Sequence, residues 1–325
     1  MPIFDERTGA YNYGALRGVA PARAPTLSFR GAGRDRKVDL RRYSSPIVDQ
    51  QDIGSCAACA GVSALEHLVV KKGERLERRS PLFVYFNSRR ISGRHTNTNG
   101  GLMICHVTAG VMAWGVCPER DWPYITANAT REPPRQAYDK AQGFDAIQYA
   151  RLGSAEEAKV TINSGLPVMF GCNIGKGYFD AAAADGRMPD VGAIDGGPPV
   201  AHIMLAVGYD DDARTWLVKN SWGDRYGDRG YLHIPYALLD KHVWHEDLWV
   251  IGELEKLSNA NLEGSTSEAV ADAQRNGERD VAAAMKALGQ ELRQDLEKRV
   301  DDAKLSMRER LQAQERELEA RRRKD

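Results

Sequence analysis

Helical patterns precede strand patterns in the middle of this chain, and this order limits the folds available to it. Apolar residues recur at helical spacing over residues 56–71, whereas residues 202–210, 215–222 and 230–235 have the pattern of strands between turns. Helices grouped before strands are typical of an α+β protein, in which a helical part packs against a sheet. With 325 residues, 42% of them hydrophobic, the chain is long enough for one such domain with two lobes and with extensions.

Four regions of the chain differ in composition. Residues 1–36 are rich in Gly, Pro, Ala and Arg and have no lasting periodicity, so we expect an irregular arm. Residues 37–253 contain the core, and residues 254–280 form a polar linker. In residues 281–325 apolar side chains recur in steps of three and four, which predicts a long amphipathic C-terminal helix. This helix either associates with another helix, as in a coiled coil or bundle, and gives a homo-oligomer, or it stays solvated or folds back on the core.

Charge and hydropathy exclude several classes of partner. Lys plus Arg and Asp plus Glu both number 45, so no overall field attracts nucleic acid or an anionic membrane. No segment has about 18 consecutive apolar residues, and the N-terminus lacks the basic and then apolar pattern of a secretory signal. We therefore expect neither nucleic acid nor a membrane as partner, and a cytoplasmic location unless export follows another route. Five cysteines cannot all pair, so at least one thiol is free, and no Cys and His spacing completes a metal site; we expect no metal and no cofactor.

A cysteine lies at the predicted start of the helix at residues 56–71. Gly54 and Ser55 make a tight turn, and the helical pattern begins at Cys56 itself. A helix N-terminus carries partial positive charge, which favours a thiolate and makes the cysteine more nucleophilic. The backbone N–H of Cys56 and the side-chain amide of Gln50, six residues earlier, are suited to stabilise a developing oxyanion. We thus expect a nucleophile and an oxyanion hole from one short segment.

This segment and a second one resemble the papain family of cysteine peptidases. The first contains Gln50, Gly54-Ser55-Cys56 and Glu66, and the second contains His202 and then Lys219-Asn220-Ser221-Trp222-Gly223. The resemblance spans roughly residues 37–252 and implies the papain-like fold, in which a cleft separates a helical lobe from a β-barrel-like lobe. It also implies a thiol protease, a hydrolase in which Cys56 is the nucleophile, His202 the base and Asn220 the residue that orients the histidine. Trp222 would shield the bond between His202 and Asn220 from water.

The same resemblance places substrate-binding residues along the cleft. Asn99-Gly100-Gly101 is similar to the family's glycine wall, where the backbone of Gly101 binds an extended peptide like an added strand. The second specificity pocket would be lined by Leu102, Met103, Val200 and Ala201, with Gly171 at its floor. These residues are apolar or small, so we expect a peptide or protein substrate with a bulky apolar residue two positions before the cut.

The chain also departs from the common pattern of the family. Ala57 and Ile53 replace an aromatic residue and a disulfide cysteine, which resembles bacterial members and agrees with a reducing compartment. The start pattern Val38-Asp39-Leu40-Arg41 leaves about 36 residues upstream, too few for the family's long helical prodomain. We expect this arm either to cover the active-site cleft and lower basal activity or to pack on the back of the domain.

Two further interpretations of the sequence remain open. Cys56-Ala-Ala-Cys59 is also a C-x-x-C at a helix start, as in thioredoxin-like redox proteins or half of a zinc site. That interpretation leaves His202 and Asn220 without a function, and we expect Cys59 to be a small core residue instead. The other interpretation is a catalytically silent peptide-binding or assembly module on the same fold, which the intact set of Gln, Cys, His and Asn does not favour.

Overall fold

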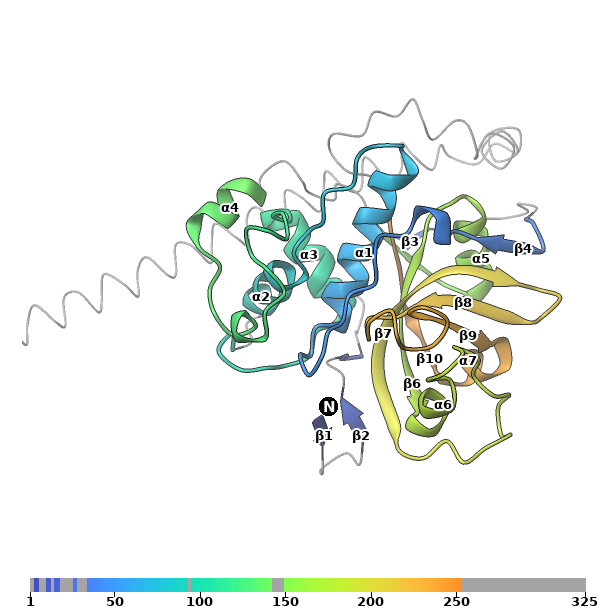
Figure 1. Cartoon of the computed structure of the whole chain (residues 1–325). Coiled ribbons are helices and arrows are strands. Elements are labelled where there is room, and N and C mark those ends of the chain that lie inside the picture. The colour runs from blue at the N-terminus through green and yellow to red at the C-terminus, as the bar shows by residue number, and fades with distance from the viewer. Residues whose placement is uncertain are drawn as a thin grey trace, which may run out of the picture.

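The computed structural model describes residues 3–5, 10–12, 15–17, 26–27, 34–92, 95–141 and 149–252. These residues form a group of helices on one side and a sheet on the other, as Figure 1 shows. Helices dominate the core up to residue 141 and strands dominate it from residue 149, so the predicted α+β order is confirmed. The linker expected at residues 254–280 and the helix expected at residues 281–325 lie outside the described residues and stay predictions.

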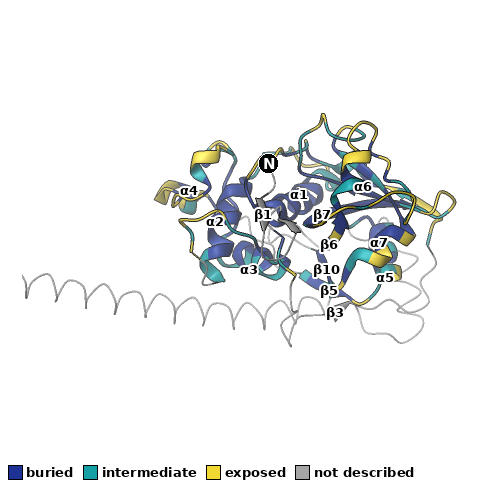
Figure 2. Ribbon diagram, turned by 90° about the horizontal axis from the view of Figure 1, so that it is seen from below, coloured by how far each residue is buried: buried dark blue, intermediate teal, exposed yellow. Residues whose placement is uncertain are grey.

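The helical lobe is built around one buried helix, α1 (Cys56–Lys71). Every residue from Cys56 to Val69 is buried, which suits a helix that is apolar on nearly all sides and lies between the two lobes (Figure 2). Helices α2 (Pro81–Ile91) and α3 (Ile104–Trp114) pack on α1, and Gly61 permits the close approach because a Cβ there would lie 2.6 Å from Val107 Cγ1. The other helical segments before residue 149 are η1 (Arg41–Tyr43), η2 (Thr126–Asn128) and α4 (Arg135–Ala141).

The second lobe is a mostly antiparallel sheet with the long strand β7 (Pro199–Asp210) near its centre. The strand order is β1-β2-β7-β6-β10-β5-β3, while β4 pairs with β7 and β8 pairs with both β7 and β9. The other strands are β1 (Ile3–Asp5), β2 (Ala10–Asn12), β3 (Thr26–Leu27), β4 (Lys37–Asp39), β5 (Tyr149–Leu152), β6 (Val168–Gly175), β8 (Thr215–Lys219), β9 (Tyr231–Pro235) and β10 (Val243–Ile251). Strands β7, β8 and β9 match the three that the sequence predicts, except that β8 ends at Lys219.

Strand β7 is contacted by helices of both lobes. Helices α5 (Ala155–Asn163), α6 (Lys176–Ala181) and α7 (Tyr236–His242) belong to the sheet lobe, and α5 and α1 both contact β7. Met169 of β6 reaches toward α1, whereas its neighbours Val168 and Phe170 face α5, because side chains alternate along a strand. The interface between the lobes therefore joins α1 and α3 of the helical lobe to β7, β6 and β10 of the sheet lobe. In the described part of the chain, no helix is both long and apolar enough to cross a membrane.

Candidate active site

Cys56 is the first residue of α1 and lies at the interface between the lobes. Ser55 is the N-cap residue, so the helix start expected from the sequence is confirmed. Burial raises the pKa of the Cys56 thiol, which is 0% exposed, well above its ordinary value, and the nearby backbone N–H groups of Ile203 and Ala57 only partly offset this. Desolvation of the thiol thus acts in the opposite direction to the helix N-terminus, which favours the thiolate.

His202 lies in β7 and is hydrogen-bonded to Asn220, which follows the end of β8. The distance from His202 Nε2 to Asn220 Oδ1 is 2.8 Å, so the ring N–H donates and the amide oxygen accepts. This tautomer makes Nδ1, on the other side of the ring, the basic nitrogen. Burial lowers the pKa of His202 to about 4, and the bond to Asn220 opposes that change.

Aromatic rings cover the hydrogen bond between His202 and Asn220. The Trp222 ring stacks on the imidazole with centroids 4.8 Å apart and planes at 24°. Phe179 lies edge-on to His202 at 6.0 Å and 5.0 Å from Trp222. The two bonded residues are 0% and 4% exposed, so Trp222 lies where it keeps water from their hydrogen bond.

Helix α1, which begins at Cys56, packs on β7, the strand that contains His202. Ile203, whose N–H group affects the Cys56 thiol, directly follows His202. His202 is also the register partner of Cys172 on β6, and the Cys172 thiol is close enough to influence Cys56 electrostatically. The bonded pair His202 and Asn220, which follow Cys56 by 146 and 164 positions in the chain, thus belongs to the part of the sheet lobe on which α1 packs.

The Gln50 side chain is fixed beside the start of α1. It is 0% exposed, its Nε2 donates to the Ile53 carbonyl oxygen at 2.8 Å, and its Oε1 accepts from Ser221 Oγ at 2.7 Å. The backbone N–H of Gln50 also donates to the Ser221 carbonyl oxygen at 2.8 Å. Because Ser221 directly follows Asn220, these bonds connect the predicted oxyanion donor to the residue that orients the histidine.

Asn99 connects the glycine wall to the segment before Cys56. Its Oδ1 accepts from the Gly54 N–H at 2.8 Å, and its Nδ2 donates to the Asp52 carbonyl oxygen at 2.8 Å. The Tyr85 hydroxyl lies 2.8 Å from the Gly100 carbonyl oxygen and accepts from the Gly100 N–H at 3.0 Å. Asn99 therefore ties the start of the glycine wall to the segment before Cys56, and Tyr85 of α2 fixes Gly100, while Gly101 is half-buried.

The residues expected in the second specificity pocket come from both lobes. Leu102 and Val200 are 0% exposed, while Met103 and Ala201 are half-buried. A Cβ at Gly171 would lie 2.1 Å from Trp244 Cε3, so the Trp244 ring of β10 fills the space over this glycine. Sequence reasoning missed Trp244, because no local pattern around it points to a site 73 positions earlier in the chain.

The N-terminal arm adds a strand next to one predicted wall of the cleft. Strand β2 runs parallel to the start of β7, with Tyr11 beside Val200 and Asn12 beside Ala201. Strand β1 pairs with β2 on its other side and extends the sheet further. Two of the residues expected to contact substrate are therefore paired with the arm's backbone.

The arm also contacts the other predicted wall of the cleft. Ala15 forms a parallel bridge with Leu102, and the Leu16 N–H donates to the Leu102 carbonyl oxygen at 2.9 Å. Ala15 is 2% exposed, so this contact excludes water. A salt bridge joins Arg17 to Glu246 of β10 just beyond this contact.

The second cysteine of the C-x-x-C motif, Cys59, lies beside Ser55 in α1. Its sulfur lies 3.6 Å from Ser55 Oγ, it is 1% exposed, and burial raises its pKa to about 12. All five cysteines are free thiols, so Cys56 and Cys59 form no disulfide in this structure. Over the described ranges no group of three or more His, Cys, Asp or Glu side chains could hold a metal ion. Cys59 is thus a buried residue of α1, as the sequence predicts.

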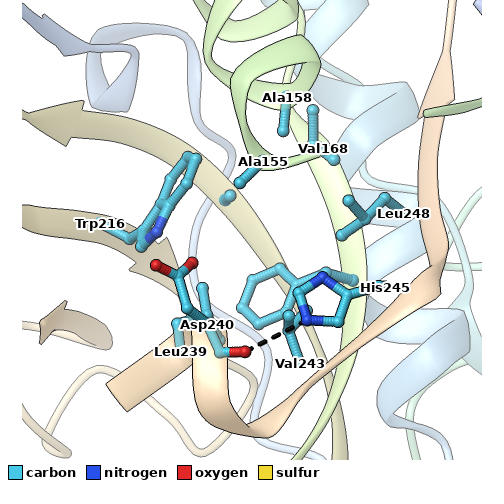
Figure 3. Close-up of a pocket in the computed structure, with 11 residues that line it drawn as sticks. Ala155, Ala158, Val168, Trp216, Leu239, Asp240, Val243, His245 and Leu248 are labelled. Atoms are coloured by element: carbon cyan, nitrogen blue, oxygen red, sulfur yellow. Dashed lines mark hydrogen bonds between the residues drawn. The ribbon is translucent and has the colours of Figure 1, made fainter. Parts of the chain in front are cut away.

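A hollow in the sheet lobe lies apart from all these residues (Figure 3). Its lining comes from α5, α7 and the adjoining strands and consists of Ala155, Ala158, Val168, Phe170, Ala206, Trp216, Leu239, Asp240, Val243, His245 and Leu248. His245 Nε2 donates to the Asp240 carbonyl oxygen at 3.2 Å at its rim. None of the residues expected to act in catalysis or substrate binding lines the hollow, so it is not part of the candidate active site.

Known proteins share both the sequence pattern and the fold. Residues 35–241 match the family described as papain family cysteine protease. An uncharacterised peptidase C1-like protein of Acanthamoeba polyphaga mimivirus is 27% identical over 229 residues, which cover 67% of this chain and 73% of that protein. Cysteine proteinase 1 of Entamoeba histolytica is 28% identical over 210 residues, which cover 61% of this chain and 63% of that protein. Xylellain, a cysteine protease from Xylella fastidiosa, has a similar structure, with a TM-score of 0.67 and 29% identity over 75% of this chain and 97% of that one.

Proposed function

This chain belongs to the papain family of cysteine proteases, and we propose that it hydrolyses peptide bonds with Cys56 as nucleophile, His202 as base and Asn220 as the residue that orients the base. The observation that carries the proposal is the buried 2.8 Å hydrogen bond from His202 Nε2 to Asn220 Oδ1, next to a cysteine at a helix start. It leaves Nδ1 as the nitrogen that exchanges a proton with the thiol.

The reaction proceeds through a thioester on Cys56. His202 Nδ1 takes the thiol proton, and the sulfur attacks the carbonyl carbon of the scissile peptide bond. The C–N bond then breaks as the imidazolium gives its proton to the leaving amine. Water next gives a proton to His202, attacks the thioester and releases the carboxylic acid, while the proton returns to the sulfur. The Cys56 N–H and the Gln50 amide stabilise the oxyanion in both steps.

We propose that the substrate lies extended along Gly101 and presents a bulky apolar residue two positions before the cut. The apolar side chains of Leu102, Val200 and Met103 support this preference. The Trp244 ring over Gly171 makes the expected floor of the pocket aromatic and shallow. A peptide library should reveal the preference directly, and selection of acidic or basic residues at that position would contradict the pocket assignment.

A fluorogenic peptide with an apolar residue at that position tests the activity. Turnover is expected for the wild type and for Cys59→Ala, and Cys56→Ala should abolish it because the nucleophile is gone. The two variants are matched, since both remove a buried thiol from α1. Labelling by an epoxysuccinyl inhibitor should follow the same pattern. Peptide binding without turnover in the wild type would instead identify a silent binding module.

We further propose that residues 1–36 cover the cleft and lower basal activity. The backbone pairing of β2 with Val200 and Ala201, and of Ala15 and Leu16 with Leu102, supports this idea, since both predicted walls are occupied. Burial of Cys56 and His202 also favours the neutral thiol and imidazole over the ion pair. Displacing the arm would hydrate both groups and favour the reactive thiolate.

Protein beginning at Lys37 provides the test of the covering arm. Peptide turnover and the rate of inhibitor labelling should rise several-fold relative to the full chain, because the arm acts at the roughly millimolar effective concentration of a tethered ligand. Adding the missing segment as a separate peptide should lower the turnover again. Equal rates in the two proteins would contradict the proposal and place the arm's function elsewhere.

A further inference from the structure

Tyr124 contacts both ends of the segment that carries the oxyanion donors, and we propose that it positions them; this rests on the protease function proposed above. The Tyr124 hydroxyl donates to the Gln50 carbonyl oxygen at 3.2 Å and lies 2.5 Å from Ser55 Oγ. Gln50 carries the side-chain donor, and Ser55 directly precedes Cys56, which carries the backbone donor. One hydroxyl group therefore connects the two halves of the proposed oxyanion hole, in addition to the backbone bonds that Gln50 and Ser55 make with Ile53.

The Tyr124 hydroxyl belongs to a small buried hydrogen-bond network. The Gln50 carbonyl oxygen accepts from Tyr124 at 3.2 Å and also from the Ile53 N–H at 3.1 Å. The Tyr124 and Ser55 hydroxyls are hydrogen-bonded to each other at 2.5 Å, and the Cys59 sulfur lies 3.6 Å from Ser55 Oγ. Connected hydrogen bonds in a buried place strengthen each other.

Tyr124 is itself held firmly in the helical lobe. Its backbone N–H donates to Glu119 Oε1 at 2.6 Å. Two residues before it, the Trp122 carbonyl oxygen accepts from Ser80 Oγ at 2.6 Å. Ser80 is the N-cap of α2, where its hydroxyl accepts from the Phe83 N–H at 3.1 Å. The hydroxyl that holds the oxyanion segment is therefore tied to the start of a buried helix.

Gln50 receives contacts from both lobes. Its side chain and backbone N–H are bonded to Ser221 in the sheet lobe, whereas its carbonyl oxygen is bonded to Tyr124 in the helical lobe. Cys56 belongs to the helical lobe as the first residue of α1. The Tyr124 contact therefore sets the place of Gln50 relative to the helix that supplies the nucleophile, and an error of a fraction of an ångström there weakens transition-state binding.

Tyr124→Phe in the full chain tests this inference, because it removes the hydroxyl and keeps the ring. Peptide hydrolysis needs the oxyanion hole, whereas alkylation of Cys56 by iodoacetamide joins sulfur to a saturated carbon and expels iodide without forming an oxyanion. We expect kcat to fall about tenfold, with KM and the alkylation rate each changing by less than about twofold. In a protein that already carries Gln50→Ala, Tyr124→Phe should lower kcat by less than about twofold, since one oxyanion donor is already absent.

Tyr138→Phe is the matched control, because the Tyr138 hydroxyl bonds to Asn87 Oδ1 at 3.0 Å in the same lobe and contacts no residue of the site. It should leave kcat unchanged, and urea unfolding of both variants shows whether each is folded. An unchanged kcat in Tyr124→Phe, or an equal fall in the rates of hydrolysis and alkylation, would overturn this inference and leave the proposed protease function standing. A wild-type protein without peptide turnover would refute the proposed function, and this inference with it.

Discussion

Replacing Glu119 with glutamine should make the free energy of unfolding less dependent on pH. Burial raises the pKa of the Glu119 carboxyl to about 7, and the N–H bond from Tyr124 opposes this. Glu119 Oε1 accepts that bond at 2.6 Å, whereas Oε2 is buried and has no hydrogen-bond partner among the described residues. The ionised carboxylate is therefore poorly solvated in the folded protein.

The sign of the effect follows from where the proton is bound. Below pH 4.5, the ordinary pKa of this side chain, Glu119 is protonated in both the folded and the unfolded protein. Between pH 4.5 and about 7 only the folded protein keeps the proton, so the free energy of unfolding of the wild type falls as the pH rises. Above about 7 the carboxyl is ionised in both states, and the loss is constant. Each pH unit between the two pKa values corresponds to about 1.4 kcal/mol, so the loss is at most about 3 kcal/mol.

Urea unfolding of the full chain at pH 5, 6, 7 and 8, followed by tryptophan fluorescence, measures this difference. The glutamine of Glu119→Gln is neutral at every pH and keeps an acceptor for the Tyr124 N–H. The free energy of unfolding of the variant should therefore exceed that of the wild type by an amount that grows to about 3 kcal/mol between pH 5 and 8. Glu132→Gln removes a charge from an exposed pair with Arg90 in the same lobe and controls for net charge. A difference between Glu119→Gln and the wild type that stays constant with pH would refute the reasoning.

Three other outcomes are expected. Asn220→Ala removes the acceptor of His202 Nε2, so kcat for a fluorogenic peptide should fall more than about tenfold with little change in KM, and an equal change in both would contradict this. Arg17→Ala breaks an exposed salt bridge to Glu246 and should raise full-chain turnover by at most about fivefold; a comparable rise for Glu246→Gln in protein beginning at Lys37 would exclude the arm as the cause. Deleting residues 281–325 should lower the number of chains per particle, which light scattering gives as particle mass divided by chain mass. An unchanged number of chains would rule out self-association through this segment.

From the sequence alone, the helix α1, the strands β7, β8 and β9, and a set of candidate catalytic residues could be predicted. The start of α1 at Cys56 follows from a Gly-Ser turn and an apolar run, and β7 and β9 follow from apolar residues between turns. These signals lie within contiguous residues, so they can be read without knowing what the segment packs against. The prediction that His202 and Asn220 act with the cysteine came from motifs in the right order, and the structure shows the hydrogen bond between these two residues.

Only the tertiary structure decided the environment of those residues. The helix N-terminus predicts a lowered Cys56 pKa, but burial reverses the direction, and the extent of burial depends on how the lobes and the arm meet. Two contacts join residues far apart in the chain: the Trp244 ring lies over Gly171, 73 positions away, and the Tyr124 hydroxyl bonds to Gln50, 74 positions away. No local sequence pattern predicts either contact. Local patterns specify helices and strands because backbone hydrogen bonds and side-chain periodicity act between near neighbours, whereas solvation and hydrogen-bond partners are set by whatever distant segments the packed core brings to the same place.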